Sequence, residues 1–473
     1  MKNASALLLV QVLNPLLGMV FVIALARLDG ALGLGAYTFA LSLVLIFENI
    51  AGLGVREYLI REIGRNPGEW RALLNSALVL GVAAALLAQL AMLLFAHAVG
   101  YDQETVAGLF IVSFALLPGL LHYLSVSFLY AFDEMTWASA SFVIETVVRT
   151  AAGLLIVYLD LGMNWLLASF VMSRLVAALV AGWAQIRRLG WPGRQWDRRV
   201  FRDLLAATPT FGAMAILAAV YWRLNIVLLS RLSGAEAVGH YSAGYRLMDL
   251  IAFAGGSILT ATYPAMTRLF HHFREDFRLL LDKGVQYALA GYLPIAVMVH
   301  ELSPQIIALF FGPDFAPAVD GLRLLTWATL PLTLAKLFAN GLVIAGRQNL
   351  DLRVNLYRLA ANAVLSYVLI MKFGMLGACW ALLLSLAASV VLQIYYLRAV
   401  APLRWSLAPI IKPALAALAL LAALELTSGW PLLLQTLLAA ASYAVTYLLL
   451  RPFDSGDRRA LHCLGKQPVG ELA

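Results

Sequence analysis

Cysteine, histidine and charged residues are scarce in this chain of 473 residues. Of its two cysteines, Cys379 lies in an apolar run and Cys463 in a polar tail, so no disulfide framework is expected. The seven histidines show no metal-ligand spacing on a common face. No Gly-rich phosphate loop and no Ser/His/Asp set stands out either. We therefore expect no metal, no cofactor and no catalytic residues, and the chain is predicted not to be an enzyme.

Long apolar runs dominate the sequence instead. Apolar residues make up 62% and charged residues 13% of the chain, against roughly 45–50% and 25% in soluble proteins. A helix needs about 20 apolar residues to cross a bilayer, and fourteen such runs follow one another from residue 5 to residue 450. Alternating strands of about ten residues, which a membrane barrel requires, are not seen. The prediction is an all-α polytopic membrane protein with about fourteen transmembrane helices.

The connections between the runs alternate in charge. One set is rich in Arg and Lys, as at residues 56–71, 187–202 and 268–283, and the opposite set offers acids such as Asp102 and Asp314. By the positive-inside rule the basic set is cytoplasmic, which places both termini in the cytoplasm. The net charge of +8 is then a topology signal, and no nucleic-acid partner is inferred from it.

Landmarks recur along the chain at nearly constant spacing, which indicates an internal duplication. The paired landmarks are Gly35-Ala36-Tyr37 with Gly239-His240-Tyr241, 204 residues apart, Pro118 with Pro331, 213 apart, and Gly162-Met163 with Gly374-Met375, 212 apart. An even number of spans in each repeat makes the repeats parallel about an axis along the membrane normal. Substrate sites in such transporters lie near the midplane between the repeats.

The duplication predicts two pseudo-symmetric six-helix lobes. The N-terminal lobe covers residues 1–190, and the C-terminal lobe covers residues 204–398. A basic cytoplasmic linker at residues 191–203 joins them, where Arg side chains gain roughly 1 kcal/mol each near anionic membrane lipids. An extra helix pair at residues 405–450 and a cytoplasmic tail at residues 451–473 complete the predicted chain.

Nine charged residues lie well inside the apolar runs, where a charge costs at least about 2.5–3.5 kcal/mol at the bilayer centre. They are the cations Arg149, Arg174, Arg223, Arg246, Lys336 and Arg358 and the acids Glu48, Glu145 and Asp249. The surplus of three positive charges favours an anionic substrate. For each residue taken alone, helix packing or snorkelling to the interface is as good an explanation as a role in a substrate pathway.

The six cations are the candidate substrate-binding residues, because guanidinium groups fit the oxygens of a diphosphate. Arg174 and Arg223 are the sharper candidates, since neither has an acidic residue three or four positions away. Lys336 follows Pro331, whose missing N–H loosens the helix. The proline is explained equally well by a helix that bends as a gate and by a static, packed kink. Arg358 lies nearer the predicted cytoplasmic end, where it either captures the head group or snorkels.

Four residues have the spacing of ion pairs within one helix: Glu145 with Arg149, and Arg246 with Asp249. For these four a structural role is favoured over a direct role in binding substrate.

The three acids are the candidate ion-coupling residues, for a proton or Na⁺. Glu48 is the least neutralised, because no basic residue lies within four positions of it. If Glu48 is buried, desolvation favours its neutral form and allows proton exchange. A neutral Glu48 that donates to a backbone carbonyl is at least as good an explanation.

Residues 52–65, GLGVREYLIREIGR, close the second apolar run. This stretch resembles the polysaccharide-transport family of lipid-linked oligosaccharide flippases. Residues 223–230 (RLNIVLLS) and 238–247 (VGHYSAGYRL) are similar to that family's seventh and eighth helices, and residues 311–315 (FGPDF) to a later loop. The family shares its superfamily with multidrug and toxic-compound extrusion proteins, and the resemblance implies two six-helix lobes around a central cavity that opens to one side at a time.

The resemblance implies a flippase that moves a polyprenyl-diphosphate-linked oligosaccharide across the bacterial cytoplasmic membrane. Its partners would be that glycan lipid, membrane lipids, and the glycan polymerase and glycosyltransferases of the same pathway. A cation-coupled drug exporter ranks second, because its cavity is expected to carry net negative charge. A membrane-embedded glycan polymerase or ligase ranks lower, because the predicted extracytoplasmic connections are too short for a folded domain.

Overall fold

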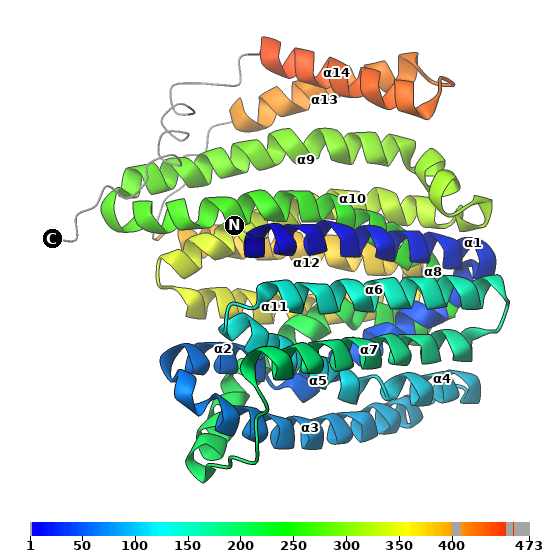
Figure 1. The fold of residues 1–473 in the computed structure, drawn as a ribbon. Helices are drawn as coiled ribbons and strands as arrows, with labels where there is room; N and C mark the ends of the chain where they lie inside the picture. Colours follow the sequence, from blue (N-terminus) through cyan, green and yellow to red (C-terminus); the bar gives the residue numbers. More distant parts are fainter. Residues whose placement is uncertain (1, 400–407, 451–456, 458–473) are drawn as a thin grey trace. The chain divides into compact units, whose positions relative to one another are not determined.

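The computed structural model describes residues 2–399, 408–450 and 457 (Figure 1). The described chain is almost entirely helical and contains no strand in these ranges, so the prediction of an all-α membrane protein is confirmed. The predicted tail at residues 451–473 lies outside the described residues apart from Asp457, as do the first residues of the predicted pair at 405–450.

Fourteen α-helices follow one another in the described chain. They are α1 (Lys2–Gly52), α2 (Val55–Arg65), α3 (Trp70–Val99), α4 (Gln103–Ser113), α5 (Leu116–Ala131), α6 (Met135–Tyr158), α7 (Met163–Leu189), α8 (Arg198–His272), α9 (Arg274–Phe310), α10 (Ala318–Ile344), α11 (Gln348–Phe373), α12 (Met375–Leu397), α13 (Ala408–Leu426) and α14 (Leu432–Leu449). Eleven helical stretches of the described residues are long and apolar enough to span a membrane. This is a multi-pass membrane protein.

Two of these helices each contain two of the predicted spans. Helix α1 is interrupted at Gly30 (φ 69°), and α8 is interrupted at Gly234 (φ 84°). A positive φ of this size is left-handed backbone, which glycine adopts without the steric cost that a Cβ brings. In the structure, a single non-helical glycine therefore joins the helices of predicted spans one and two, and another joins those of spans seven and eight.

The predicted fourth span, residues 105–132, is two helices. Helix α4 ends at Ser113 and α5 begins at Leu116. Pro118 explains the break, because a proline ring inside a helix collides with the carbonyl of the residue four positions earlier, which here is Phe114. Its counterpart Pro331 lies within the continuous helix α10, so the two landmark prolines have different local effects.

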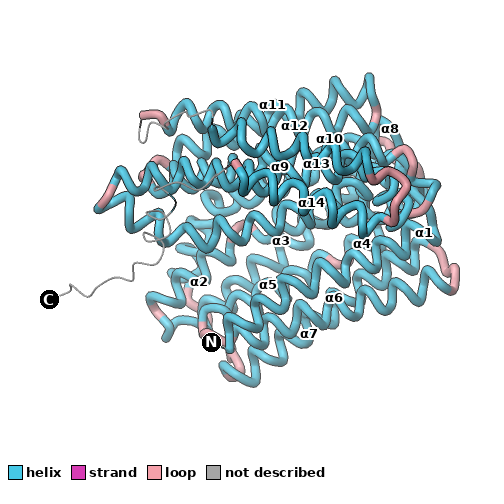
Figure 2. The backbone as a smooth tube through the Cα atoms, turned by 90° about the horizontal axis from the view of Figure 1, so that it is seen from above, coloured by secondary structure: helices cyan, strands magenta, loops and turns pink. Residues whose placement is uncertain are grey.

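The chain forms two compact units, residues 1–242 and 243–473, with the boundary inside α8. The lobes predicted at residues 1–190 and 204–398, joined by the linker at 191–203, stay a prediction. In unit 1, α6 packs along α1 and α7, and α7 also packs on α5 (Figure 2). In unit 2, α10 packs between α9 and α12, and α12 packs on α11.

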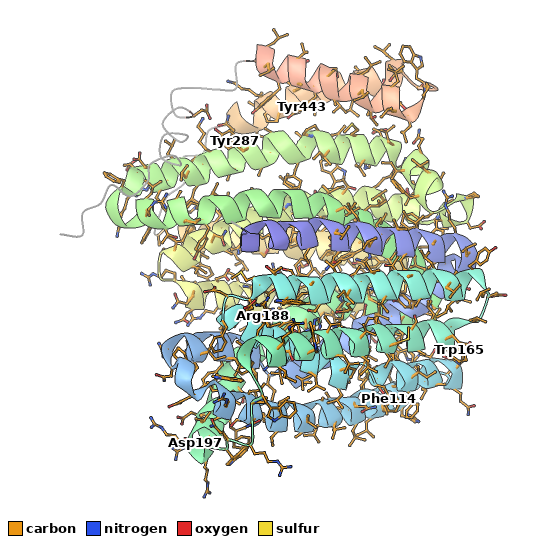
Figure 3. All side chains as sticks on the ribbon, viewed as in Figure 1. Phe114, Trp165, Arg188, Asp197, Tyr287 and Tyr443 are labelled. Carbon is orange, nitrogen blue, oxygen red and sulfur yellow. The ribbon has the colours of Figure 1, made fainter. Side chains whose placement is uncertain are left out.

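The last two helices of unit 2 pack on α9 (Figure 1). Buried aliphatic residues such as Leu302 of α9 and Leu420 of α13 form their common core. The hydroxyl of Tyr443 on α14 donates a hydrogen bond of 2.8 Å to the carbonyl of Ala290 on α9. Tyr287 lies on α9 as well (Figure 3), and its hydroxyl donates a hydrogen bond of 2.7 Å to the carboxylate of Asp457.

Two of the landmark glycines meet in unit 1. A Cβ built on Gly35 of α1 would overlap the carbonyl of Ala235 on α8, and one built on Gly239 of α8 would overlap the carbonyl of Ala31 on α1. The two backbones therefore touch at a place where no larger residue fits without movement. We call this contact between Gly35 and Gly239 the glycine crossing.

The two ends of α7 mark the two ends of unit 1. Arg188, near the C-terminus of α7, lies at the same end as Asp197 of the linker, and Trp165 lies at the opposite end (Figure 3). Asn75 of α3 holds the linker there, because its side-chain amide donates to the carbonyls of Gly193 at 3.2 Å and Gln195 at 2.8 Å.

Candidate functional site

Four ionisable side chains meet inside unit 1, each from a different helix. Glu48 comes from α1, His122 from α5, Glu145 from α6 and Arg174 from α7. Their side chains are at most 11% exposed. We call these four residues the buried charge cluster.

Arg174 lies between two carboxylates of this cluster. Its Nη2 donates to Glu48 Oε2 at 3.1 Å, and its Nε lies 3.4 Å from Glu145 Oε1. The guanidinium also lies over the ring of Phe170, 5.3 Å from the ring centroid. Arg174 has no acidic neighbour on its own helix, as the sequence indicated, but it is neutralised from two other helices.

His122 is the member of the cluster that sequence analysis missed. Its Nε2 lies 2.9 Å from Ser141 Oγ on α6, and its Nδ1 lies 3.5 Å from Glu145 Oε2. The imidazole is fully buried and packs edge-on against the ring of Phe142. Its signal in the sequence is a single histidine inside an apolar run, which metal-ligand spacing does not single out.

The position of Glu48 depends on a glycine of α5. A Cβ on Gly119 would lie 2.6 Å from Glu48 Oε1, closer than such atoms approach. Glu48 also has a salt-bridge partner on another helix, Arg174 of α7, which spacing along one helix does not reveal.

The remaining cations of unit 1 are less enclosed. Arg149 on α6 and Arg223 on α8 are half-buried. Neither side chain forms a hydrogen bond or an ion pair with another residue in the described part of the chain. The suggested pairing of Glu145 with Arg149 is not seen, because Glu145 faces Arg174 and His122 instead. The guanidinium groups of Arg149 and Arg223 both belong to helices that are long and apolar enough to span a membrane.

The candidates of unit 2 have electrostatic partners. Arg246 is exposed and Asp249 half-buried on α8, and both take part in polar or electrostatic interactions. Lys336 of α10 is exposed and lies in electrostatic range of Asp249. Arg358 on α11 is half-buried and in range of Asp351.

Asp351 belongs to a small polar network of unit 2. It accepts from the side-chain amides of Asn355 at 3.0 Å and Gln393 at 3.3 Å. Across the ranges that the structure describes, no three His, Cys, Asp or Glu side chains are grouped as metal ligands.

Solved transporter structures resemble this fold. The lipid II flippase MurJ in an inward closed conformation matches with a TM-score of 0.77 and 15% identity, over 95% of this chain and 98% of that chain. A multidrug resistance MATE family transporter in an inward-facing conformation matches with a TM-score of 0.66 and 15% identity, over 82% of this chain and 94% of that one. At these identities the matches show the fold.

Sequence relatives come from archaea and bacteria. The chain is 22% identical to the probable low-salt glycan biosynthesis flippase Agl15 of Haloferax volcanii, over 79% of this chain and 78% of that protein. It is 20% identical to a putative O-antigen transporter of Shigella flexneri, over 78% of this chain and 91% of that protein. An uncharacterized membrane protein of Methanocaldococcus jannaschii is 20% identical, and there the chain spans only about half of the relative, 46% of its length.

Two family models match in sequence. The MatE model matches residues 209–368. The model described as polysaccharide biosynthesis protein matches residues 1–270, which is more than half of the 473 residues. The chain therefore belongs to the polysaccharide biosynthesis protein family.

Proposed function

We propose that this protein is a flippase that moves a polyprenyl-diphosphate-linked oligosaccharide, the precursor of a surface polysaccharide, across the bacterial cytoplasmic membrane by alternating access. The family, the flippase and O-antigen transporter names of its relatives, and the MurJ-like fold all support this. The protein binds and moves its substrate without changing its covalent bonds. Both termini lie in the cytoplasm in this proposal, because the basic connections do.

The observation that carries the proposal is the pair of half-buried guanidinium groups of Arg149 and Arg223. A charged hydrogen bond contributes about 1.5–3 kcal/mol, and a diphosphate offers several acceptor oxygens to the planar fork of donors on each Arg. We assign Arg149 and Arg223 to the diphosphate in unit 1. Arg246, Lys336 and Arg358 are the proposed substrate-binding cations of unit 2. Arg174, held by Glu48 and Glu145, is assigned to coupling rather than to direct binding.

The experiment is flipping of a fluorescent polyprenyl-diphosphate oligosaccharide in proteoliposomes. Arg223→Ala and Arg149→Ala are each expected to reduce flipping about tenfold or more, because loss of a charged hydrogen bond costs on this scale. Arg231→Ala is the matched control, because Arg231 lies on the same helix as Arg223 and is exposed. Wild-type flipping in both variants would refute the assignment.

A cation-coupled drug exporter of the same superfamily is the second candidate, since the MATE structures share the fold over 82% of this chain. Transport of a lipophilic cation by the same proteoliposomes, with no transport of the glycan lipid, would favour it. Glu48, Glu145 and Asp249 are the proposed ion-coupling residues under either function.

A further inference from the structure

The protonation of His122 follows from its hydrogen bonds. Ser141 Oγ donates its own proton to the carbonyl of Ala138 at 2.8 Å. It is therefore an acceptor toward His122 Nε2, 2.9 Å away, and Nε2 carries a hydrogen. In the neutral imidazole the other nitrogen, Nδ1, is then an acceptor.

That acceptor faces a carboxylate. Nδ1 lies 3.5 Å from Glu145 Oε2, is buried and receives no hydrogen bond. Two acceptor atoms that face each other away from water repel, and a buried polar atom without a hydrogen-bond partner destabilises the site. One proton between Nδ1 and Oε2 removes both the repulsion and the missing hydrogen bond, because either atom can carry the proton and the other can accept a hydrogen bond from it.

The neighbouring charges call for the same proton. Around His122, α1 contributes Glu48, α6 contributes Glu145, and α7 contributes Arg174. Two carboxylates and one guanidinium leave one negative charge, and isolated charge is costly in a buried site. One added proton makes the cluster neutral.

Other titratable groups near α5 do not alter this count. Tyr37 of α1 and Tyr123 of α5 are in electrostatic range of Arg174 but are uncharged at neutral pH. Arg56 of α2 lies over the ring of Tyr123, 5.2 Å from its centroid, and donates to its hydroxyl at 3.2 Å. In the described part of the chain, no titratable side chain of α3 has a recorded contact with the cluster.

We propose that His122 and Glu145 form the proton-binding site of the transporter, with one proton shared between His122 Nδ1 and Glu145 Oε2. This rests on the flippase function proposed above and names its coupling ion. When the proton binds, the Glu145 carboxylate becomes a carboxylic acid that donates to Nδ1, and Arg174 keeps one charged partner, Glu48. When the proton leaves to water, Glu145 regains its negative charge and holds Arg174 together with Glu48. The proton therefore changes the electrostatic link between α6 and α7, two helices packed side by side.

Infrared difference spectroscopy of the reconstituted protein between high and low pH tests the site directly. We expect a carboxylic-acid C=O band that appears on acidification, is lost in Glu145→Gln, and is displaced in frequency in His122→Gln. His300→Gln is the matched control, because His300 Nδ1 already accepts from Trp327 Nε1 at 3.2 Å and lies in unit 2. A band that survives in Glu145→Gln, or that is unchanged in His122→Gln, would overturn the proposal.

A second spectrum separates a proton site from a structural role. With ¹⁵N-labelled histidine, the signal assigned to His122 by its loss in His122→Gln should report hydrogen on Nε2. Ser141→Ala removes the acceptor of that hydrogen, so it should populate the form with hydrogen on Nδ1. A His122 signal with hydrogen on Nδ1 in the wild-type protein at high pH would refute the proposed arrangement.

Flipping under an imposed pH gradient then connects the site to transport. Glu145→Gln, which keeps a donor facing Nδ1 but cannot titrate, should lose the acceleration of flipping by the gradient. If the infrared band behaves as expected but wild-type flipping ignores the gradient, the proton site stands and coupling fails. If the glycan lipid is not flipped at all, the proposed function fails independently of the infrared result.

Discussion

At the scale of single residues, the position of Arg174 between two carboxylates decides how the buried charge cluster responds to substitution. A buried ion pair is not in itself a large source of stability, because desolvation offsets much of the attraction. Removal of one partner is different, because it leaves charge buried without compensation. Arg174 faces Glu48 and Glu145, so its loss affects two carboxylates at once.

Arg174→Ala is accordingly expected to destabilise the protein by about 3–5 kcal/mol, the range measured when a buried ion pair loses one member. Thermal unfolding in detergent and the abundance of the variant in membranes measure this. Arg187→Ala is the control, because Arg187 is exposed on the same helix. The double variant Glu48→Gln with Arg174→Gln should recover part of the loss. A single variant as stable as wild type would contradict the recorded ion pairs.

Asp102 gives a pH-dependent prediction outside the membrane spans. Its carboxylate caps α4 by accepting from the Thr105 amide at 3.1 Å and the Thr105 hydroxyl at 2.7 Å. These bonds lower the pKa of Asp102 from its ordinary value of 3.8. A lowered pKa means that the cap stabilises the fold above pH 3.8 and is lost as the pH falls through the lower folded-state value.

Asp102→Ala should therefore cost about 1 kcal/mol at pH 7, the usual loss for an N-cap. The difference from wild type should shrink in acid, where both proteins lack the charged cap. Thermal unfolding midpoints of both proteins at pH 7 and at pH 3 measure this. A difference that grows on acidification would show that the sign is wrong.

At the scale of helices, the glycine crossing joins α1 to α8 without room for side chains. Gly35→Ala or Gly239→Ala places a methyl group on a backbone carbonyl of the facing helix, which cannot rotate away as a side chain would. The helices must separate, so we expect greater reactivity of a cysteine at Ala31 beside the crossing and a lower unfolding temperature.

Gly18→Ala is the control for this prediction, because the space around Gly18 on α1 is open. Labelling of Ala31→Cys with a maleimide, in the presence of each glycine substitution, measures the separation. Equal labelling in all three backgrounds would mean that the crossing tolerates a methyl group.

Much of the helical architecture could be predicted from sequence, and the reasons are local. Apolar length predicted the spans, and the paired landmarks Gly35 and Gly239 prove to be in contact. The helix break at Phe114 could also be predicted from sequence, because Pro118 clashes with the carbonyl of the residue four positions before it. The partners of Arg174 were not, since Glu48 lies 126 positions away in sequence and helix periodicity says nothing about how separate helices face each other.

The role of His122 was hidden for a related reason. Its meaning depends on Ser141 and Glu145, two residues of another helix at specific distances. A single apolar-run histidine carries no such information. Arg149 shows the converse, because the spacing of an ion pair within one helix was present and Glu145 nevertheless faces α7.

At the scale of the whole molecule, the distribution of basic residues predicts which end of unit 1 faces the cytoplasm. Asp197 lies at the end with Arg188, and Trp165 lies at the other (Figure 3). In a variant without Cys379 and Cys463, Asp197→Cys should escape an impermeant maleimide in intact cells, whereas Trp165→Cys should be labelled. Permeabilised cells supply the control in which both react, and the reverse pattern would invert the assigned topology.

The hold of Asn75 on the linker also bears on the order of biosynthesis. Its bonds to Gly193 and Gln195 close loops of 118 and 120 residues, and closing a long loop costs chain entropy before any contact compensates. The rest of α3 and helices α4 to α7 lie between these partners, so these bonds form only after the linker has left the ribosome. Docking of the linker onto Asn75 therefore follows the synthesis of all the intervening helices, which makes it a late event in the maturation of this unit.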